Sequence, residues 1–164
     1  DSNGFITIYD TYIKELVSIA DGAINILFTL QTGIQPAQWI LETIRAAPSS
    51  WRWFVRFHPG MYADLDSVKE LFNVCKAAKV EFDYSTNLPL PAWLRHVDVH
   101  ITHSSTCILE AKYFGVFSVA TDALATELFP EQFSSDTVML ASTADELIKK
   151  IKIQANKRKP ISIN

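Results

Sequence analysis

The sequence predicts an α/β fold, specifically a Rossmann-like three-layer sandwich built on a parallel sheet of about six strands. Segments typical of strands alternate with segments typical of helices along most of the 164 residues. The first strand-like run, 23–30, is continuously apolar, as expected when helices cover both faces of a sheet. The chain is also too short for an eight-fold barrel. Its 48% apolar and 20% charged residues fit one globular domain.

Six segments read as strands, namely 23–30, 51–60, 80–85, 97–102, 116–122 and 137–142. The first, "AINILFTL", is rich in Ile, Leu and Phe, and Pro36 then suits the first position of a helix. The second strand stops at His58-Pro59-Gly60, because proline cannot continue a central strand. The next helix, 66–78, has Ser67 and Glu70 at the spacing of a capping box.

The second half of the chain continues the alternation. Segment 88–96 reads as a loop that leads into a helical turn, and the helix after the fourth strand, 106–115, ends at Gly115. Pro130 breaks the short helix 125–133. The last helix begins at Thr143, which has capping-box spacing to Glu146.

This alternation predicts three parts: a linker or N-terminal extension over 1–22, a Rossmann-like domain over 23–155, and a tail over 156–164. The tail holds the only basic cluster, Lys157, Arg158 and Lys159, which is typical of a solvated end. With a net charge of -3, the sequence does not favour nucleic acid as a partner. The chain lacks an initiator Met, so we expect it to be a piece of a longer protein.

Composition also bears on the cellular compartment. No apolar run approaches the roughly 20 residues of a membrane span. The two cysteines, Cys75 and Cys107, lie among apolar neighbours on predicted helices, which favours buried free thiols and a reducing compartment, although one disulfide is the alternative.

Ligands of open parallel sheets bind beyond the carboxyl ends of the strands. Three short polar loops fall there, after the first, second and fourth predicted strands, and they supply the candidate binding residues Gln31, Thr32, Gly33, His58, Pro59, His103, Ser104, Ser105 and Thr106. The loops at the other edge, such as "AAPSS" and "AAK", carry no comparable pattern. We therefore expect one ligand site, at the carboxyl edge of the sheet.

The loop "HSST" is the strongest candidate for binding an anion. A helix that starts near Ser105 or Thr106 would present several unpaired N–H groups and its positive dipole end, which together suit phosphate. The alternative is that Ser104 or Ser105 only caps this helix. Glu110, one turn further on, is either a surface residue or an acceptor for ribose hydroxyls.

Histidine chemistry makes His58 the candidate catalytic residue. Pro59 restrains it at a strand end, where it could donate to phosphate as a cation or transfer a proton. His103 is a weaker candidate of the same kind. His100 and His103 are three residues apart in a strand, so they should point to opposite faces, which argues against a shared metal. We expect no metal site and no cofactor.

Several common motifs are absent from the sequence. It contains neither Gly-x-Gly-x-x-Gly nor a Walker loop, which disfavours the usual dinucleotide and ATPase sites. "HSSTC" lacks the small flanking residues of a nucleophile elbow. The acidic pair in "DLD" at 64–66 is explained by the start of a helix.

The "HP" after the second strand, the Ser/Thr-rich turn after the fourth, and the following helix with Glu and Gly resemble the C-terminal half of GT-B glycosyltransferases. Bacterial sialyltransferases, capsule-polysaccharide transferases and CDP-glycerol glycerophosphotransferases are the most similar families. "SSTCILEAKYFGVFSVATDALATELFPE" also resembles UDP-N-acetylglucosamine 2-epimerases, which share that fold. The resemblance covers about 24–155.

This resemblance implies roles for individual residues. His58 would contact the donor phosphate, residues 104–106 would bind phosphate, Glu110 would hold the ribose, and 121–127 would lie near the sugar. Two departures affect the sugar contacts: Gly115 is followed by Val-Phe where the families have Gly-x-Pro, and Ala123-Leu-Ala replaces a segment with a basic residue.

The resemblance also implies a function: the donor-nucleotide-binding half of a metal-independent glycosyltransferase in surface polysaccharide or lipopolysaccharide synthesis. Its substrates would be a CMP-, CDP- or UDP-linked sugar and a glycan acceptor. An N-terminal domain would complete the enzyme, in the cytoplasm or peripherally at the inner membrane, and the isolated half would be inactive. The alternatives are a UDP-sugar epimerase-like domain and a non-catalytic α/β interaction domain.

Overall fold

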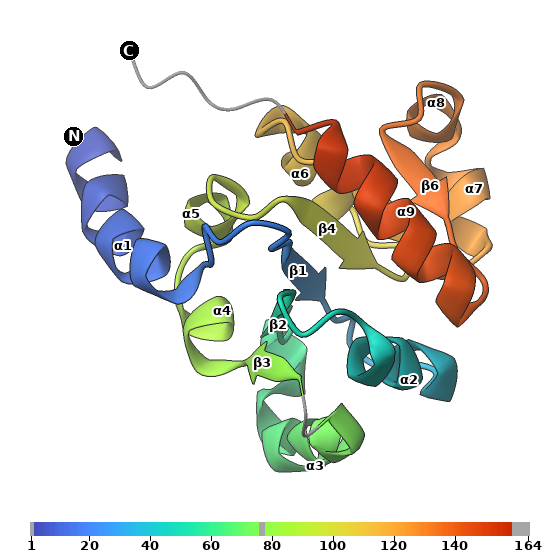
Figure 1. Ribbon diagram of the computed structural model, residues 1–164, viewed down its shortest axis with the longest axis horizontal. Helices are drawn as coiled ribbons and strands as arrows, with labels where there is room; N and C mark the ends of the chain where they lie inside the picture. Colours follow the sequence, from blue (N-terminus) through green and yellow to red (C-terminus); the bar gives the residue numbers. More distant parts are fainter. Residues whose placement is uncertain (1, 76–77, 159–164) are drawn as a thin grey trace.

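A computed structural model describes residues 2–75 and 78–158 of the chain (Figure 1). Its six strands are β1 (Asn25–Thr29), β2 (Arg52–Arg56), β3 (Lys79–Glu81), β4 (Val99–Thr102), β5 (Ser118–Ala120) and β6 (Val138–Leu140). All neighbouring strands pair in parallel, in the order β3-β2-β1-β4-β5-β6. The predicted α/β fold with a six-stranded parallel sheet is therefore confirmed.

Helices lie on both sides of this sheet. They are α1 (Ser2–Leu16), α2 (Gln38–Ala46), α3 (Leu65–Leu71), α4 (Asp83–Asn87), α5 (Leu90–Leu94), α6 (Cys107–Tyr113), α7 (Leu124–Leu128), α8 (Pro130–Ser134) and α9 (Ala144–Asn156), with 3-10 helices η1 (Pro59–Asp64) and η2 (Phe72–Cys75). None of these, within the described part of the chain, is both long and apolar enough to cross a bilayer.

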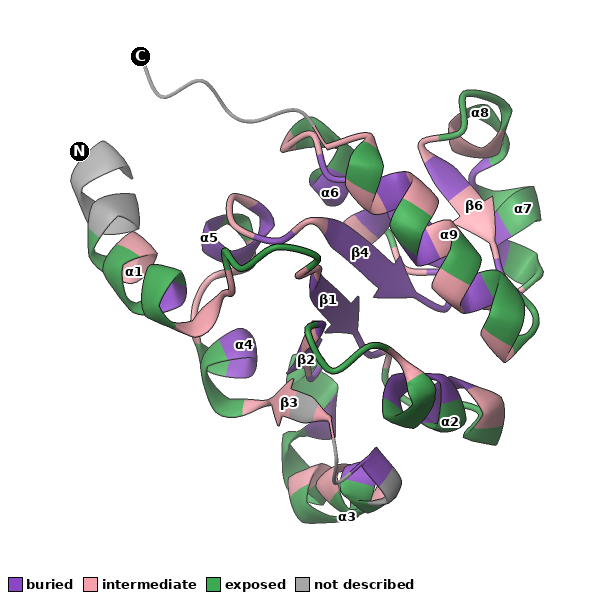
Figure 2. Cartoon of the chain, in the orientation of Figure 1, coloured by how far each residue is buried: buried purple, intermediate pink, exposed green. Residues whose placement is uncertain are grey.

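The central strands are apolar on both faces because both faces are covered. Every residue of β1 and of β4 is buried, as Figure 2 shows for the middle of the sheet. Ile26, Phe28 and Ile101 belong to one core cluster, which includes residues of α2, α3 and α9. Leu27 and Phe54 belong to the other, with residues of α1, α5 and α6. Alternate residues of the strands thus fill the two layers.

Several predicted helix ends are confirmed. Thr143 caps α9 by accepting a hydrogen bond from the Glu146 amide at 3.2 Å. Gly115 follows α6 with a φ of 74°, a left-handed conformation that favours glycine. Pro130 separates α7 from α8 and occupies the first turn of the latter.

Two predicted helix starts are wrong. Helix α2 begins at Gln38 rather than at Pro36, because Ala37 remains extended with a ψ of 150°. Helix α3 begins at Leu65, directly after the 3-10 turn η1, so Ser67 lies inside the helix and cannot form the predicted capping box. The segment 88–96, predicted as a loop with at most a helical turn, includes the short helix α5.

The opening segment contains a helix that the sequence analysis did not predict. Helix α1 occupies most of 1–22, and its Ile13 is fully buried in the cluster that holds Leu27 and Phe54. Of the predicted tail, Lys159 and the residues after it lie outside the described residues. Both cysteines are free thiols, but only Cys75 is buried, whereas Cys107 is half-buried.

Candidate functional site

The strand order places a topological switch point between β1 and β4. The chain moves from β1 outward to β2 and β3, and then returns to β4 and moves outward to β5 and β6. The loops after β1 and β4 therefore leave the sheet in opposite directions and open a crevice, where open α/β sheets bind their ligands. The sequence analysis predicted the carboxyl edge but not which strands flank this crevice.

Hydrogen bonds connect all three predicted loops at this edge. The Ser104 amide donates to Gln31 Oε1 at 2.8 Å, which joins the β4 loop to the β1 loop. Thr32 Oγ1 lies 2.7 Å from His58 Nδ1, which joins the β1 loop to the β2 loop. The structure therefore brings the predicted loops together into one cluster.

The prediction of several unpaired amides ahead of α6 is wrong for three of them. Besides the Ser104 amide, the Ser105 amide contacts Thr102 Oγ1 at 3.4 Å, and the Cys107 amide donates to Ser105 Oγ at 3.2 Å. Among the amides of 104–107, only that of Thr106 has no partner in the described part of the chain. Helix α6 also starts later than predicted, at Cys107.

The hydroxyls of this loop divide into one paired and two unpaired groups. Ser105 Oγ accepts from the Cys107 amide in the turn that leads into α6, but the N-cap residue is Thr106, whose side chain forms no cap hydrogen bond. Ser104 Oγ and Thr106 Oγ1 have no hydrogen-bond partner among residues 2–75 and 78–158. Ser104 is buried and Thr106 is exposed. Two hydroxyls thus remain available to a ligand.

His58 is held by two contacts at a single ring nitrogen. Its Nδ1 accepts a hydrogen bond from the Gly60 amide at 3.1 Å, in addition to the contact with Thr32 Oγ1. Because an amide can only donate, Nδ1 carries no hydrogen, and the neutral ring has its N–H at Nε2. His58 is exposed, and Pro59 begins η1 directly after it. The side chain therefore offers a fixed N–H donor to the crevice edge.

The Thr32–His58 contact depends on Gly60. A Cβ built on Gly60 would lie 2.7 Å from Thr32 Oγ1 and 3.3 Å from His58 Nδ1. Gly33, in contrast, has open space around it but a φ of 78°, which suits glycine for conformational reasons. The two glycines are therefore required for different physical reasons.

His103 lies beneath the edge rather than on it. Its side chain is buried, and its ring packs edge-to-face on Phe28 with centroids 6.2 Å apart. Burial lowers the pKa of His103, although nearby Asp122 opposes this shift. Its Nδ1 is buried without a hydrogen-bond partner, as is Thr121 Oγ1, just after β5. Unpaired buried polar atoms are uncommon, and these two lie beside the crevice.

His100 lies within β4 and points to the face opposite to that of His103, which follows the strand, as predicted. Its Nε2 lies 2.8 Å from Thr29 Oγ1 and its Nδ1 lies 2.8 Å from Ser118 Oγ, so it joins three strands. Complete burial lowers the pKa of His100 to about 3. His100 is thus a satisfied neutral core residue, and no group of three potential metal ligands occurs in the described part of the chain.

Arg56, which the sequence analysis missed, lies at the carboxyl edge. It is the last residue of β2, and its Nη1 donates to the carbonyls of Ser85 and Leu88 at 2.8 and 2.6 Å. Burial lowers the pKa of Arg56, while Cys107, Tyr62 and Glu110 raise it electrostatically. The guanidinium thus lies within electrostatic reach of α6. The sequence pattern that could have identified this residue is an arginine at the end of an otherwise apolar strand.

Glu110 lies in the first turn of α6, where it is exposed. It is therefore accessible beside the crevice.

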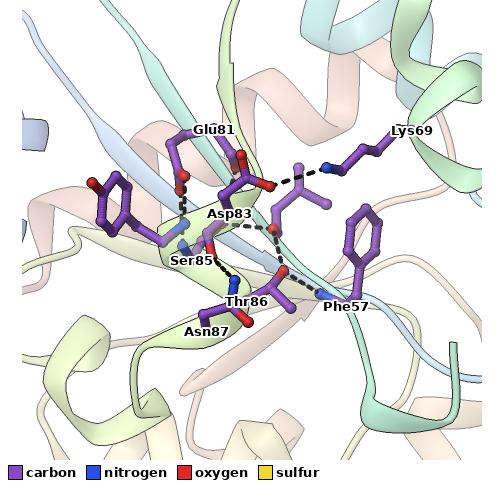
Figure 3. A network of polar contacts seen from close by, with 9 residues as sticks. Phe57, Lys69, Glu81, Asp83, Ser85, Thr86 and Asn87 are labelled. Carbon is purple, nitrogen blue, oxygen red and sulfur yellow. Dashed lines mark hydrogen bonds and ion pairs between the residues drawn. The ribbon is translucent and has the colours of Figure 1, made fainter. Parts of the chain in front are cut away.

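A hollow of about 220 Å³ opens at the ends of β2 and β3. The stacked rings of Phe57 and Phe82, with centroids 5.7 Å apart, contribute to its wall. Figure 3 shows the polar network around it: Thr86 Oγ1 accepts from the Phe57 amide at 3.1 Å, and Lys69 pairs with Asp83 at 3.0 Å. Aromatic walls with polar groups at the mouth suit a planar ring.

Comparison with known proteins places this architecture among solved structures. No family model and no curated protein matches the sequence. A UDP-GlcNAc 2-epimerase from Methanocaldococcus jannaschii, solved with UDP-GlcNAc and UDP, aligns with a TM-score of 0.65 at 18% identity over 92% of this chain and 42% of its own. The glycotransferase of kitacinnamycin aligns with a TM-score of 0.57 at 19% identity over 84% of this chain and 36% of its own.

A third structure is a single domain of similar size. The C-terminal CMP-Kdo binding domain of WaaA from Acinetobacter baumannii aligns with a TM-score of 0.60 at 14% identity, over 94% of this chain and 97% of its own. The chain thus spans less than half of the glycotransferase and epimerase chains and nearly all of the WaaA domain. The predicted resemblance is confirmed at the level of the fold: the chain has the Rossmann-like fold that these glycosyltransferase, epimerase and nucleotide-sugar-binding structures share.

Proposed function

We propose that the chain is the donor-nucleotide-binding half of a glycosyltransferase. One observation carries the proposal: three polar loops are hydrogen-bonded to one another at the switch point, yet they leave unpaired donors there. Those donors are Ser104 Oγ, Thr106 Oγ1, the Thr106 amide and His58 Nε2. Hydroxyl, amide and imidazole donors in one crevice are suited to the oxygens of a phosphate.

In this proposal, residues 104–106 and His58 hold the donor phosphates, together with Gln31, Thr32, Gly33 and Pro59 of the neighbouring loops. Gln31 Oε1 occupies the Ser104 amide, so the Gln31 amide group can donate through Nε2. Glu110 accepts hydrogen bonds from the ribose. Buried His103 supports the loop from below.

The reaction would be a displacement without a metal. The acceptor oxygen forms a bond to the sugar carbon, the bond from that carbon to the phosphate oxygen breaks, and the phosphate leaves with the electron pair. Fixed donors such as His58 Nε2–H stabilise the charge that develops on the leaving oxygen. The acceptor proton goes to a base in the other half of the enzyme.

The hollow beside Phe57 and Phe82 is the proposed place of the nucleobase. Its volume of about 220 Å³ is below the roughly 300–1,000 Å³ of complete small-molecule sites, so it would hold one ring of the donor and not the whole molecule. It opens at the end of β2, the strand that His58 follows.

A second, N-terminal half of the enzyme is part of this proposal, and the lengths of two similar structures support it. Because the chain spans 36% of the glycotransferase of kitacinnamycin, an N-terminal domain that binds the glycan acceptor fits the proposal. We expect the isolated chain to bind a nucleotide weakly and to transfer nothing. A role in surface polysaccharide or lipopolysaccharide synthesis, in the cytoplasm or at the inner membrane, belongs to this proposal through the sequence resemblance.

Isothermal titration of the chain with CMP, CDP, UDP and their sugars tests the proposal. Saturable binding that weakens in Ser104→Ala, and not in the exposed control Ser49→Ala, is the expected result. The absence of heat with every nucleotide would overturn the assignment.

The second candidate is an epimerase-like domain, favoured by the TM-score of 0.65 to the UDP-GlcNAc 2-epimerase. Analysis of products formed from UDP-sugars by the complete protein distinguishes it from a transferase, because an epimerase needs no acceptor. A non-catalytic interaction domain is the third candidate, and partner binding that survives His58→Ala with Ser105→Ala would favour it.

A further inference from the structure

A second cleft opens at the amino edge of the sheet, on the side away from the switch-point crevice. We call it the basal cleft, and it has a volume of about 640 Å³. Its charged lining includes Lys14 of α1, Arg95 and His96 after α5, and Arg158 after α9. These residues come from widely separated parts of the chain, and the fold collects them around the start of β1 and β4.

Positive charge exceeds negative charge in the lining of the basal cleft. Lys14, Arg95 and Arg158 line it, against the single lining carboxylate of Asp98. Asp10 lies 3.8 Å from Arg95 and 2.5 Å from His96. The whole chain, by comparison, has a net charge of -3. The cleft is therefore a local basic site on an acidic protein.

Both carboxylates near the cleft already have partners. Asp98 Oδ2 accepts from the Asn25 amide at 2.7 Å and from Asn25 Nδ2 at 3.1 Å, and Oδ1 lies 3.4 Å from Arg158 Nη1. Asp10 contacts His96 and Arg95 as described. Neither carboxylate pairs with Lys14 within the described residues, and each arginine keeps N–H groups that these acids do not engage.

Arg158 gives the strongest indication that the basal cleft binds a ligand. Its side chain is 15% exposed, and its Nη2 donates to the Arg95 carbonyl. Its Nε is buried with no hydrogen-bond partner in the described residues. Lys14 is exposed and forms no ion pair within the same residues. A guanidinium with a free buried N–H beside further cations suits oxyanions with several acceptor atoms.

We propose that the basal cleft binds a phosphate ester, with the phosphoryl oxygens against Arg158, Arg95 and Lys14. The shared chemistry could be supplied by a soluble phosphate ester or by the headgroup of an anionic phospholipid. Ile19, at the lip of the cleft, is 98% exposed, so a membrane surface is one of the two sources to be tested. This site is separate from the proposed donor site and does not depend on it.

The test uses the 164-residue chain with His58→Ala and Ser104→Ala, so that the carboxyl edge does not contribute. Glycerol phosphate is titrated in solution, and sedimentation measures binding to vesicles of phosphatidylglycerol with phosphatidylcholine against phosphatidylcholine alone. We expect saturable binding in at least one arm. Binding in the first arm identifies a soluble ligand, and binding in the second identifies a membrane headgroup.

Two variants test the assigned residues. Arg158→Gln should weaken binding about tenfold, since it removes a charged donor. Because Arg158 also bonds the Arg95 carbonyl, Lys14→Gln provides a variant that removes no hydrogen bond or ion pair of the described residues, with an expected loss of about threefold. Lys149→Gln, an exposed change of the same charge on α9, is the matched control. No binding in either arm, or equal binding by all three variants, would overturn the proposal.

Discussion

The two edges of the sheet both collect polar groups, but they do so in different ways. At the carboxyl edge, the groups come from loops that directly follow β1, β2 and β4. At the amino edge, Lys14, Arg95 and Arg158 come from the end of one helix, the approach to a strand, and the end of another helix. Strand direction alone gathers the first set, whereas the second set exists only because of tertiary packing.

This difference determines which site can be found from sequence. In a parallel sheet, every loop after a strand lies at the same edge, so a polar pattern repeated there is visible along the chain. No rule of this kind brings Lys14 near Arg158, which is 144 positions away in the numbering. The direction of a mutational effect at the carboxyl edge can therefore be predicted from the sequence. Experiments at the amino edge instead test the packing that brings its residues together.

Acid should have the largest effect, and it should act on His100, the second residue of β4. Burial lowers the pKa of His100 to about 3 from 6.5, so the unfolded chain binds this proton more strongly than the folded chain does. Stability is therefore complete above the unfolded pKa and falls as the pH drops toward 3. We expect His100 to contribute a loss of about 3 kcal/mol between about pH 7 and pH 4, measured by urea unfolding.

His100→Gln is the control for this experiment. It should lower the free energy of unfolding at neutral pH, because it disturbs the contacts with Thr29 and Ser118, but it should flatten the dependence on pH. Burial also lowers the pKa of His103, which adds to the effect in the same direction. If the free energy of unfolding of His100→Gln falls in acid as much as that of the parent chain, the role assigned to His100 is contradicted.

The two arginines of β2 provide the next comparison, because they lie at opposite ends of one strand. Arg56→Met should lower the free energy of unfolding by about 2 kcal/mol, since the carbonyls of Ser85 and Leu88 lose a charged donor. Arg52→Met should change it by at most about 0.5 kcal/mol, since the Arg52 side chain forms no hydrogen bond or ion pair in the described part of the chain. Chemical denaturation of both variants measures the difference, and equal effects would contradict it.

Nucleotide affinity should also distinguish the carboxyl edge of the sheet from the amino edge, with a smaller effect. His58→Ala and Ser104→Ala should each weaken binding of CDP or UDP by about tenfold, because each removes one donor to phosphate. His96→Gln, a histidine change at the amino edge, should leave this affinity unchanged. Titration calorimetry on the three variants gives the comparison, and a loss in His96→Gln equal to that in His58→Ala would contradict the placement of the donor site.

The smallest expected effect concerns the two glycines of the carboxyl edge. Gly60→Ala should cost about 1 kcal/mol, because the new Cβ would lie 2.7 Å from Thr32 Oγ1. Adding Thr32→Ala should recover most of this loss. Gly33→Ala should also cost about 1 kcal/mol, but through its φ of 78°, so Thr32→Ala should not rescue it. Urea unfolding of the single and double variants measures both outcomes.

The sequence predicted the sheet well because β1 and β4 are rich in apolar and β-branched residues and are bounded by turns. It predicted the meeting of the three loops for the same reason. It did not predict the strand order, since nothing in the local pattern states that β4 returns beside β1. The placement of Pro36 and Ser67 failed because an extended residue and a 3-10 turn, respectively, precede the helices there.

Within the site, residue types were easier to predict than contacts. The hydroxyls and His58 could be named from their positions after strands. Their hydrogen bonds could not, because they depend on side-chain geometry: Gln31 satisfies the Ser104 amide, and Gly60 fixes the ring of His58. His103 was predicted at the surface of the site but is buried, because its ring packs on Phe28.

The burial of Ile13 has a practical consequence for anyone who trims this protein. A version that starts at residue 23, where the first strand-like segment begins, would uncover the apolar surface that Ile13 shields, next to Leu27 and Phe54. Losing one such side chain from a core costs roughly 1.5–3 kcal/mol, and the exposed patch would promote self-association. Shortened versions should therefore retain the first helix if they are to stay monodisperse.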